Sequence, residues 1–291
     1  MKLRHLSTKS WLKATSGRTI GRWIVRNPFD RVVVLCYHSI HSTKSFRSAA
    51  PSLFDSQLCW LKEHCEVIRF SEVSEASKAT KRNRPAVALT FDDGYADNYE
   101  QAFPLLQKHG IPATFFLTVG LLEKHPAIIA RFQMLEHSSY EDIRPLEWFQ
   151  VREMRDAGME IGTHTFSHPN LARLSREAVE FELKRSKDIM EQRLGEPVTL
   201  MAYPFGKPGC HFRDETTQIA AAATYESAAM VLYRAVSPHD SRFRIPRFVT
   251  TNDDLTTLSA KIFGAWDLLG LWQAKIPLPI ARLVSPLDFS V

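Results

Sequence analysis

The chain has 291 residues, 44% of them hydrophobic and 24% charged, a composition typical of a globular protein. Its longest unbroken apolar runs, such as residues 32–37, are far shorter than the roughly 20 residues needed to cross a bilayer. A formal net charge of +5 suits several anionic partners, but we find no zinc-finger spacing, no RNA-recognition aromatic signature and only one short basic run, at residues 81–84. We therefore expect no transmembrane span and no nucleic-acid partner.

The leader and the cysteines indicate the compartment. Residues 1–30 are rich in lysine and arginine but have neither the apolar segment nor the small-residue cleavage site of a secretory signal. The four cysteines show no CxxC spacing, and a chain of this length needs no disulfide framework. We expect a cytoplasmic protein with mostly buried, reduced thiols, whose basic leader could contact the inner leaflet of the membrane.

Strand and helix patterns alternate along the main part of the chain. Short apolar runs typical of buried strands cover residues 31–38, 86–91, 113–117, 160–164, 198–203, 224–229 and 244–249. Helical spacing of apolar residues predicts helices over 53–65, 99–109, 146–157, 175–194 and 213–223. This alternation predicts a parallel α/β sheet or barrel with its site on loops at the carboxyl ends of the strands.

The tail over residues 251–291 has an amphipathic helical pattern followed by prolines. Packing onto the main domain is the simpler interpretation, and contact with a membrane surface is the alternative. The residues concerned are Ile262, Phe263, Trp266, Leu269, Leu271, Trp272, Pro277, Pro279 and Pro286.

Two neighbouring aspartates follow a predicted strand in the segment TFDDG, residues 90–94. Carboxylates this close repel each other, and a nearby cation makes it easiest to keep both ionised. Because adjacent side chains leave a strand in opposite directions, one aspartate could ligate a metal while the other addresses a bound water. An ordinary turn is the alternative for this segment in isolation.

His164 and His168 follow another predicted strand, four residues apart. Neutral imidazole is a common metal ligand, and a tight loop between the two would let both rings converge on one ion. Two unrelated surface histidines would have the same spacing. Together with one aspartate, the pair would make a two-histidine, one-carboxylate set with open positions for water and substrate, which indicates a catalytic site.

Three segments carry a family resemblance: TFDDG, HTFSHP at residues 164–169, and YPFG at residues 203–206. They resemble the motifs of the polysaccharide deacetylase family, carbohydrate esterase family four, over about residues 31–249. The resemblance implies a distorted (β/α) barrel of about seven strands. It makes residues 31–250 the catalytic domain, between the leader (1–30) and the tail (251–291).

The resemblance also implies the roles of individual residues in metal-assisted amide hydrolysis. Asp93, His164 and His168 would bind a divalent metal, with Zn²⁺ the default, and Asp92 would be the general base. The segment Tyr203, Pro204 and Phe205 would contact substrate, and the backbone N–H of Phe205 would hold the oxyanion.

Two departures from the commonest family pattern concern the acid and an arginine. The usual Leu-x-His motif is absent after Arg247, whereas residues 35–38 (LCYH) resemble the permuted arrangement of poly-N-acetylglucosamine deacetylases. We assign His38 as the acid, with His239 as a weaker candidate and a packing role for His38 as the alternative. Ala202 stands where many relatives have an arginine that orients the base; we hypothesise that Arg247 replaces it, unless Arg247 is an ordinary surface cation.

The leading hypothesis is an N-deacetylase acting on an acetylated polysaccharide or oligosaccharide. A glycoside hydrolase is less well supported, because its two carboxylates must lie about 5 Å or more apart across a bond. Two further hypotheses are a glycan-binding protein that has lost turnover and a deacetylase of lipid-linked sugar precursors at the membrane surface.

Overall fold

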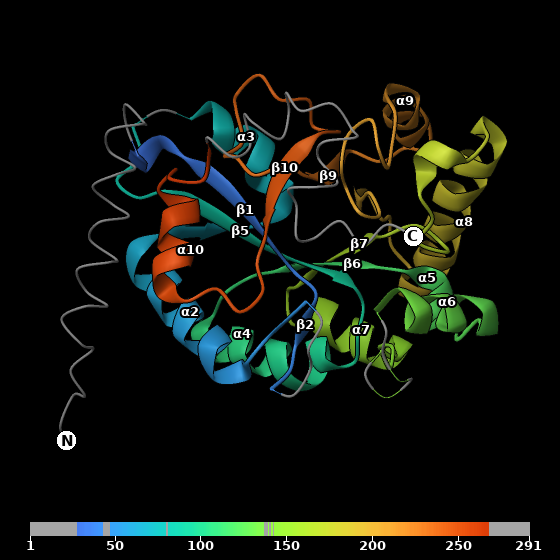
Figure 1. The fold of residues 1–291 in the computed structure, drawn as a ribbon, viewed down its shortest axis with the longest axis horizontal. Coiled ribbons are helices and arrows are strands. Elements are labelled where there is room, and N and C mark those ends of the chain that lie inside the picture. The colour runs from blue at the N-terminus through green and yellow to red at the C-terminus, as the bar shows by residue number, and fades with distance from the viewer. Residues whose placement is uncertain are drawn as a thin grey trace.

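The computed structural model describes residues 28–42, 47–79, 81–136, 139, 141 and 143–267 (Figure 1). None of the helices in these ranges is long and apolar enough to cross a bilayer. The basic leader up to residue 27, and the tail residues Leu269, Leu271, Trp272, Pro277, Pro279 and Pro286, lie outside the described residues.

Seven parallel strands form a closed barrel (Figure 1). The ring runs in the order β1, β10, β9, β8, β7, β6, β5, and β5 pairs again with β1. Each strand overlaps one of the predicted runs, so the predicted (β/α) barrel is confirmed. The strands are β1 (Val32–Tyr37), β5 (Ala86–Asp93), β6 (Thr114–Leu117), β7 (Glu160–Thr163), β8 (Leu200–Ala202), β9 (Ser227–Val231) and β10 (Ile245–Val249).

Three short strands lie outside the ring. β4 (Glu66–Ile68) pairs with the first half of β5, on the edge whose second half pairs with β6. β2 (Ser39–Ile40) and β3 (Ser48–Ala49) pair with each other directly after β1.

Helices cover the outside of the barrel (Figure 1). The predicted helices correspond to α2 (Pro51–His64), the π-helix η3 (Asn98–Ala102) with α4 (Phe103–His109), α7 (Trp148–Asp156), α8 (Arg176–Leu194) and α9 (Asp214–Ala222). Further helices, not predicted, are α3 (Val73–Lys78), α5 (Val119–Leu122) and α6 (Pro126–Glu136), with the short η1 (Pro28–Asp30), η2 (Phe70–Glu72) and η4 (Leu171–Arg173).

Successive side chains of each strand point alternately to the helices outside the barrel and to its interior, so the core has an outer and an inner layer. One cluster joins alternate strand residues such as Val33 and Leu89 to side chains of the covering helices, including Phe54 of α2. A second cluster collects Val34, Ala88 and other residues from strands around the ring, so it fills the barrel interior. Because successive side chains alternate, the same inward-facing rows lead to polar residues at the carboxyl ends of the strands. These residues are Cys36, His38, Thr90, Asp92 and Arg247, and all are buried.

The first part of the tail forms α10 (Leu255–Ile262), which packs beside α2. Leu258 and Ile262 are fully buried in the outer core, and the Arg31 guanidinium donates to the Ile262 carbonyl and pairs with Asp267. This part of the tail therefore packs onto the barrel, as the simpler interpretation predicted.

None of the four cysteines is in a disulfide. Cys36 and Cys65 are buried, but Cys210 is half-buried and Cys59 is exposed. The expectation of mostly buried thiols therefore holds for only two of them, because Cys59 lies on the outer face of α2.

Candidate active site

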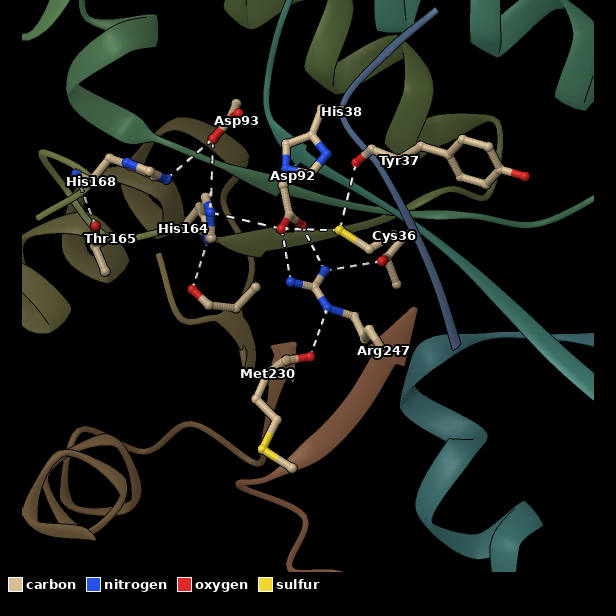
Figure 2. Close-up of polar contacts among 12 residues, drawn as sticks. Cys36, Tyr37, His38, Asp92, Asp93, His164, Thr165, His168, Met230 and Arg247 are labelled. Atoms are coloured by element: carbon tan, nitrogen blue, oxygen red, sulfur yellow. Dashed lines mark hydrogen bonds and ion pairs between the residues drawn. The ribbon is translucent and has the colours of Figure 1, made fainter. Parts of the chain in front are cut away.

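The two aspartates stand at the carboxyl end of β5 and point in different directions. Asp92 continues the inward-facing row, and its pairing partner is Phe116 on β6. Asp93 has a left-handed backbone with φ 75°, followed by Gly94 at φ 90°. This turn ends the strand and directs the Asp93 carboxylate towards the loop after β7 (Figure 2).

The loop after β7 brings His164 and His168 together. Its backbone is fixed at the start by the His164 N–H, which donates to the Leu117 carbonyl, and its Thr165 hydroxyl accepts from the His168 N–H at 3.0 Å. Thr165 and His168 both have left-handed backbone, with φ 66° and 55°. The tight loop places the two imidazole centroids 4.9 Å apart.

Asp93, His164 and His168 form a compact donor set for a cation (Figure 2). Asp93 Oδ1 lies 3.8 Å from His164 Nε2 and 3.5 Å from His168 Nε2, and no described residue donates a hydrogen bond to it. His164 Nδ1 lies 2.8 Å from the Ala202 carbonyl, which can only accept a hydrogen bond. Nδ1 therefore carries the proton, and the Nε2 lone pair faces Asp93.

The electrostatics of this set fit a divalent cation. Burial, with Glu136 and Asp92 nearby, raises the pKa of Asp93 to about 8 although Arg47 opposes the shift, so a further cation beside this carboxylate would favour its ionised form. Burial lowers the pKa of His164 and lowers that of His168 well below its usual value, which favours the neutral, ligating form of both imidazoles. An orphaned carboxylate oxygen beside two neutral imidazoles is the donor chemistry of a catalytic zinc site.

Asp92 is held by a buried arginine. Arg247 Nη1 and Nη2 donate to the two Asp92 carboxylate oxygens at 2.7 Å each, and Nη1 also donates to the Thr90 hydroxyl. Arg247 is fully buried, so it is not a surface cation. Burial alone would raise the pKa of Asp92, but Arg247 and then His164 hold it well below the usual range. Asp92 is therefore ionised and fixed in orientation (Figure 2).

A second group of potential ligands, Cys36, His38 and Asp92, adjoins the first. Both oxygens of its carboxylate already accept from Arg247, and the Arg47 guanidinium lies 3.4 Å from His38 Nε2. Positive charge on two sides makes this group a poor cation site. Burial and then Arg47 lower the pKa of His38 to about 3, so His38 is neutral in the free protein.

The model of the polysaccharide deacetylase family matches residues 79–228, just over half of the chain. The chain belongs to the polysaccharide deacetylase family. This confirms the family and the class of hydrolase predicted from the sequence motifs.

Relatives and solved structures agree with this membership. A poly-beta-1,6-N-acetyl-D-glucosamine N-deacetylase of Staphylococcus aureus is 26% identical over 219 residues, covering 71% of this chain and 69% of the relative. The Streptococcus pyogenes deacetylase PplD, solved with acetate, is 28% identical with a TM-score of 0.66, covering 80% of this chain and 98% of its own. IcaB from Ammonifex degensii has the same TM-score at 23% identity, covering 81% and 98%, and so shows the shared fold.

Tyr203, Pro204 and Phe205, the segment predicted to contact substrate in this deacetylase, follow β8 and differ from one another in their surroundings. Tyr203 is buried, stacks on Phe212 and donates its hydroxyl to the Phe243 carbonyl, so its side chain packs in the core. Pro204 is also buried. Phe205 is half-buried with φ 60°, its ring lies 4.7 Å from the His168 ring, and no described residue accepts from its N–H.

His239, the weaker candidate for the acid, lies at the wrong end of the barrel. It is exposed, and Val236, three residues before it, bridges to Val32 at the amino end of β1. Asp92, Asp93, His164 and His168 lie at the carboxyl ends of the strands, so this position of the His239 segment does not support His239 as the acid.

The sequence patterns did not reveal the residues that fix the His38 segment. The Asn98 amide donates to the His38 carbonyl at 2.8 Å, and Asp97 accepts from the Ser39 hydroxyl and the Ile40 N–H. Asn98 begins the π-helix η3, a helix type that often marks functional sites. In the sequence, this role is indicated only by the two polar residues, Asp97 and Asn98, that directly follow TFDDGYA.

Proposed function

We propose that this chain is a metal-dependent deacetylase that removes N-acetyl groups from the sugars of a polysaccharide or its precursor. The observation that carries the proposal is the meeting of an orphaned Asp93 oxygen and two neutral imidazoles beside an ionised, Arg247-bound Asp92. The relative from Staphylococcus aureus is a poly-N-acetylglucosamine N-deacetylase, and the PplD structure contains acetate, the product of deacetylation.

A divalent cation held by Asp93, His164 and His168 would polarise the acetyl carbonyl and acidify a water molecule. Asp92 would take the proton of the attacking water, since its carboxylate is ionised and Arg247 fixes its direction. The Phe205 N–H would donate to the oxyanion. Negative charge developing there would raise the pKa of His38, so that this imidazole would take up a proton from solvent and pass it to the leaving amine as the C–N bond breaks. Asp92 would return the proton of the attacking water to solvent.

Acetate release tests the proposal. Purified protein with Zn²⁺ should release acetate from N-acetylglucosamine oligomers, and a chelator should stop the reaction until Zn²⁺ is restored. Asp92→Asn should reduce acetate release to background while still binding one Zn²⁺, whereas Asp93→Ala should lose both. Undiminished release by Asp92→Asn would reject the assigned base.

A glycan-binding protein without turnover is the less well supported function. It depends on Ala202, which stands where many relatives have an arginine. Arg247 on β10 donates to both carboxylate oxygens of Asp92 and would supply that orienting charge. Glycan binding without acetate release by the Zn²⁺-loaded protein would favour this alternative.

We also propose, from the basic leader, that the enzyme is cytoplasmic and contacts the inner leaflet, where lipid-linked sugar precursors are found. Lysine and arginine near an anionic surface each contribute about 1 kcal/mol of attraction. Cell fractionation at low salt should find part of the protein with the membrane, and a wholly soluble distribution would contradict membrane contact.

A further inference from the structure

The loop that carries both histidines is anchored by a single buried carboxylate from α8. Glu182 Oε2 accepts from the Phe166 N–H at 3.0 Å and from the Ser167 N–H at 2.8 Å, while Oε1 accepts from the Ser167 hydroxyl at 2.6 Å. Glu182 is only 7% exposed. Hydrogen bonds to an ionised carboxylate are stronger than those between neutral groups, so three of them hold this part of the loop firmly.

The backbone of this loop needs such a clamp. Thr165 and His168 are non-glycine residues with left-handed φ, a conformation that costs roughly 1–2 kcal/mol per residue. Such conformations persist only where surrounding contacts impose them. The Val119 and Gly120 N–H groups of α5 donate to the carbonyls of Thr165 and Phe166. Among the residues that the structure describes, only Glu182 accepts from the Phe166 and Ser167 N–H groups at the centre of the loop.

Glu182 binds the part of the loop that lies between the two histidines. Phe166 and Ser167, the residues it binds, are two of the three residues between His164 and His168. His164 has its own anchor at the Ala202 carbonyl, whereas no described residue hydrogen-bonds His168 Nδ1. The position of the His168 ring relative to Asp93 therefore depends on the loop backbone.

We infer that Glu182 is a positioning residue for the metal site, holding the loop so that both imidazoles converge with Asp93. The inference rests on the proposed function, because it assumes that this donor set binds a cation. Residues that support metal ligands from outside the coordination sphere typically contribute 10–100-fold to metal affinity. The hydrogen bonds of Glu182 go to Phe166 and Ser167 and not to the side chains of Asp93, His164 or His168.

Zinc affinity of the full chain tests the inference without measuring activity. Competition between the purified protein and a chromophoric chelator gives the Zn²⁺ dissociation constant. Glu182→Ala should raise this constant about tenfold or more. Glu182→Gln should raise it less, since the remaining amide oxygen can still accept from both backbone N–H groups. Glu180→Ala, an exposed glutamate on the same helix, is the matched control and should leave the constant unchanged.

The outcomes separate the inference from the proposed function. A wild-type protein that binds no Zn²⁺ would contradict the proposed function itself. Wild-type binding with an unchanged constant in the Glu182 variants, accompanied by a lower melting temperature of the metal-free protein, would show a merely structural residue and overturn the inference. Should Glu182→Ala not fold, Glu182→Gln decides between these results.

Discussion

At the scale of single residues, the positive charge that binds Asp92 comes from β10. Residues 200, 202, 245 and 247 belong to inward-facing rows, so a side chain on β8 or on β10 can reach the interior. Ala202 leaves space there, and the long side chain of Arg247 crosses the barrel to bind Asp92 and cover the Phe116 ring. Arg247 belongs to the alternate residues of β10 that face the barrel interior, so it is not an ordinary surface cation.

Replacing Arg247 should impair both catalysis and folding. Arg247→Ala leaves Asp92 as an uncompensated buried charge, which typically costs about 3–5 kcal/mol of the free energy of unfolding. Acetate release by the folded fraction should fall about 100-fold or more, the size typical of losing one electrostatic partner in an active site. Arg244→Ala, which removes a more exposed arginine on the approach to β10, is the control. A near wild-type kcat in Arg247→Ala would reject the orienting role.

The pH dependence of Arg247→Ala tests whether its loss of activity comes from a changed pKa of Asp92. Arg247 depresses the pKa of Asp92, so in the wild type the ionised base persists as the pH falls. Without the guanidinium that pKa rises, and a smaller fraction of Asp92 is ionised at any given acidic pH. The acid limb of kcat/KM should therefore move to higher pH in the variant, and an unmoved limb would contradict Asp92 as the base.

At the scale of elements, α5 and the loop after β7 fit each other closely. The Gly120 N–H donates to the Phe166 carbonyl at 2.8 Å. A Cβ at Gly120 would lie 2.1 Å from Ile128 Cδ1 and 2.7 Å from that same carbonyl oxygen. A glycine is needed because the helix must approach the backbone of the loop that carries His164 and His168.

Gly120→Ala should therefore push α5 away from the loop. Overpacking of this kind typically costs about 1–3 kcal/mol of the free energy of unfolding, measurable by denaturant titration. Zn²⁺ affinity should fall as well, since the Phe166 carbonyl lies between the two histidines. Gly195→Ala at the end of α8 has open space around its Cβ but left-handed backbone, so it should lower stability alone. Unchanged Zn²⁺ affinity in Gly120→Ala would contradict the coupling.

The elements show what sequence patterns could predict. The barrel strands were predictable because buried runs such as 86–91 are continuous, and α8 because Ser175 caps its start and Gly195 its end. β4 has only three residues, and α6 buries only Ile128 and Phe132, which leaves little periodicity to detect. In the site, the donors lie within motifs, but Glu182 and Asn98 act through backbone hydrogen bonds from other elements, which spacing cannot reveal.

At the scale of the whole molecule, apolar and polar side chains occupy opposite ends of the barrel interior. The interior is apolar towards the amino ends, with Val32 and Ala86, and polar towards the carboxyl ends, with Asp92 and Arg247. α10 leaves the carboxyl end of β10 and returns to the amino end, where the Ile262 carbonyl accepts from Arg31. The tail helix therefore anchors the outer core at a distance from the reacting groups.

Ile262→Ala should lower the stability of the fold without changing Zn²⁺ affinity or kcat. Ile262 is fully buried among outer-core side chains, and truncating a buried isoleucine to alanine typically costs about 2–5 kcal/mol. Denaturant titration should show this loss, whereas the Zn²⁺ dissociation constant and kcat of the folded protein should stay at wild-type values. Thr256→Ala, a less buried position on the same helix, should change neither. Loss of Zn²⁺ affinity in Ile262→Ala would mean that the tail helix holds the catalytic end as well as the core.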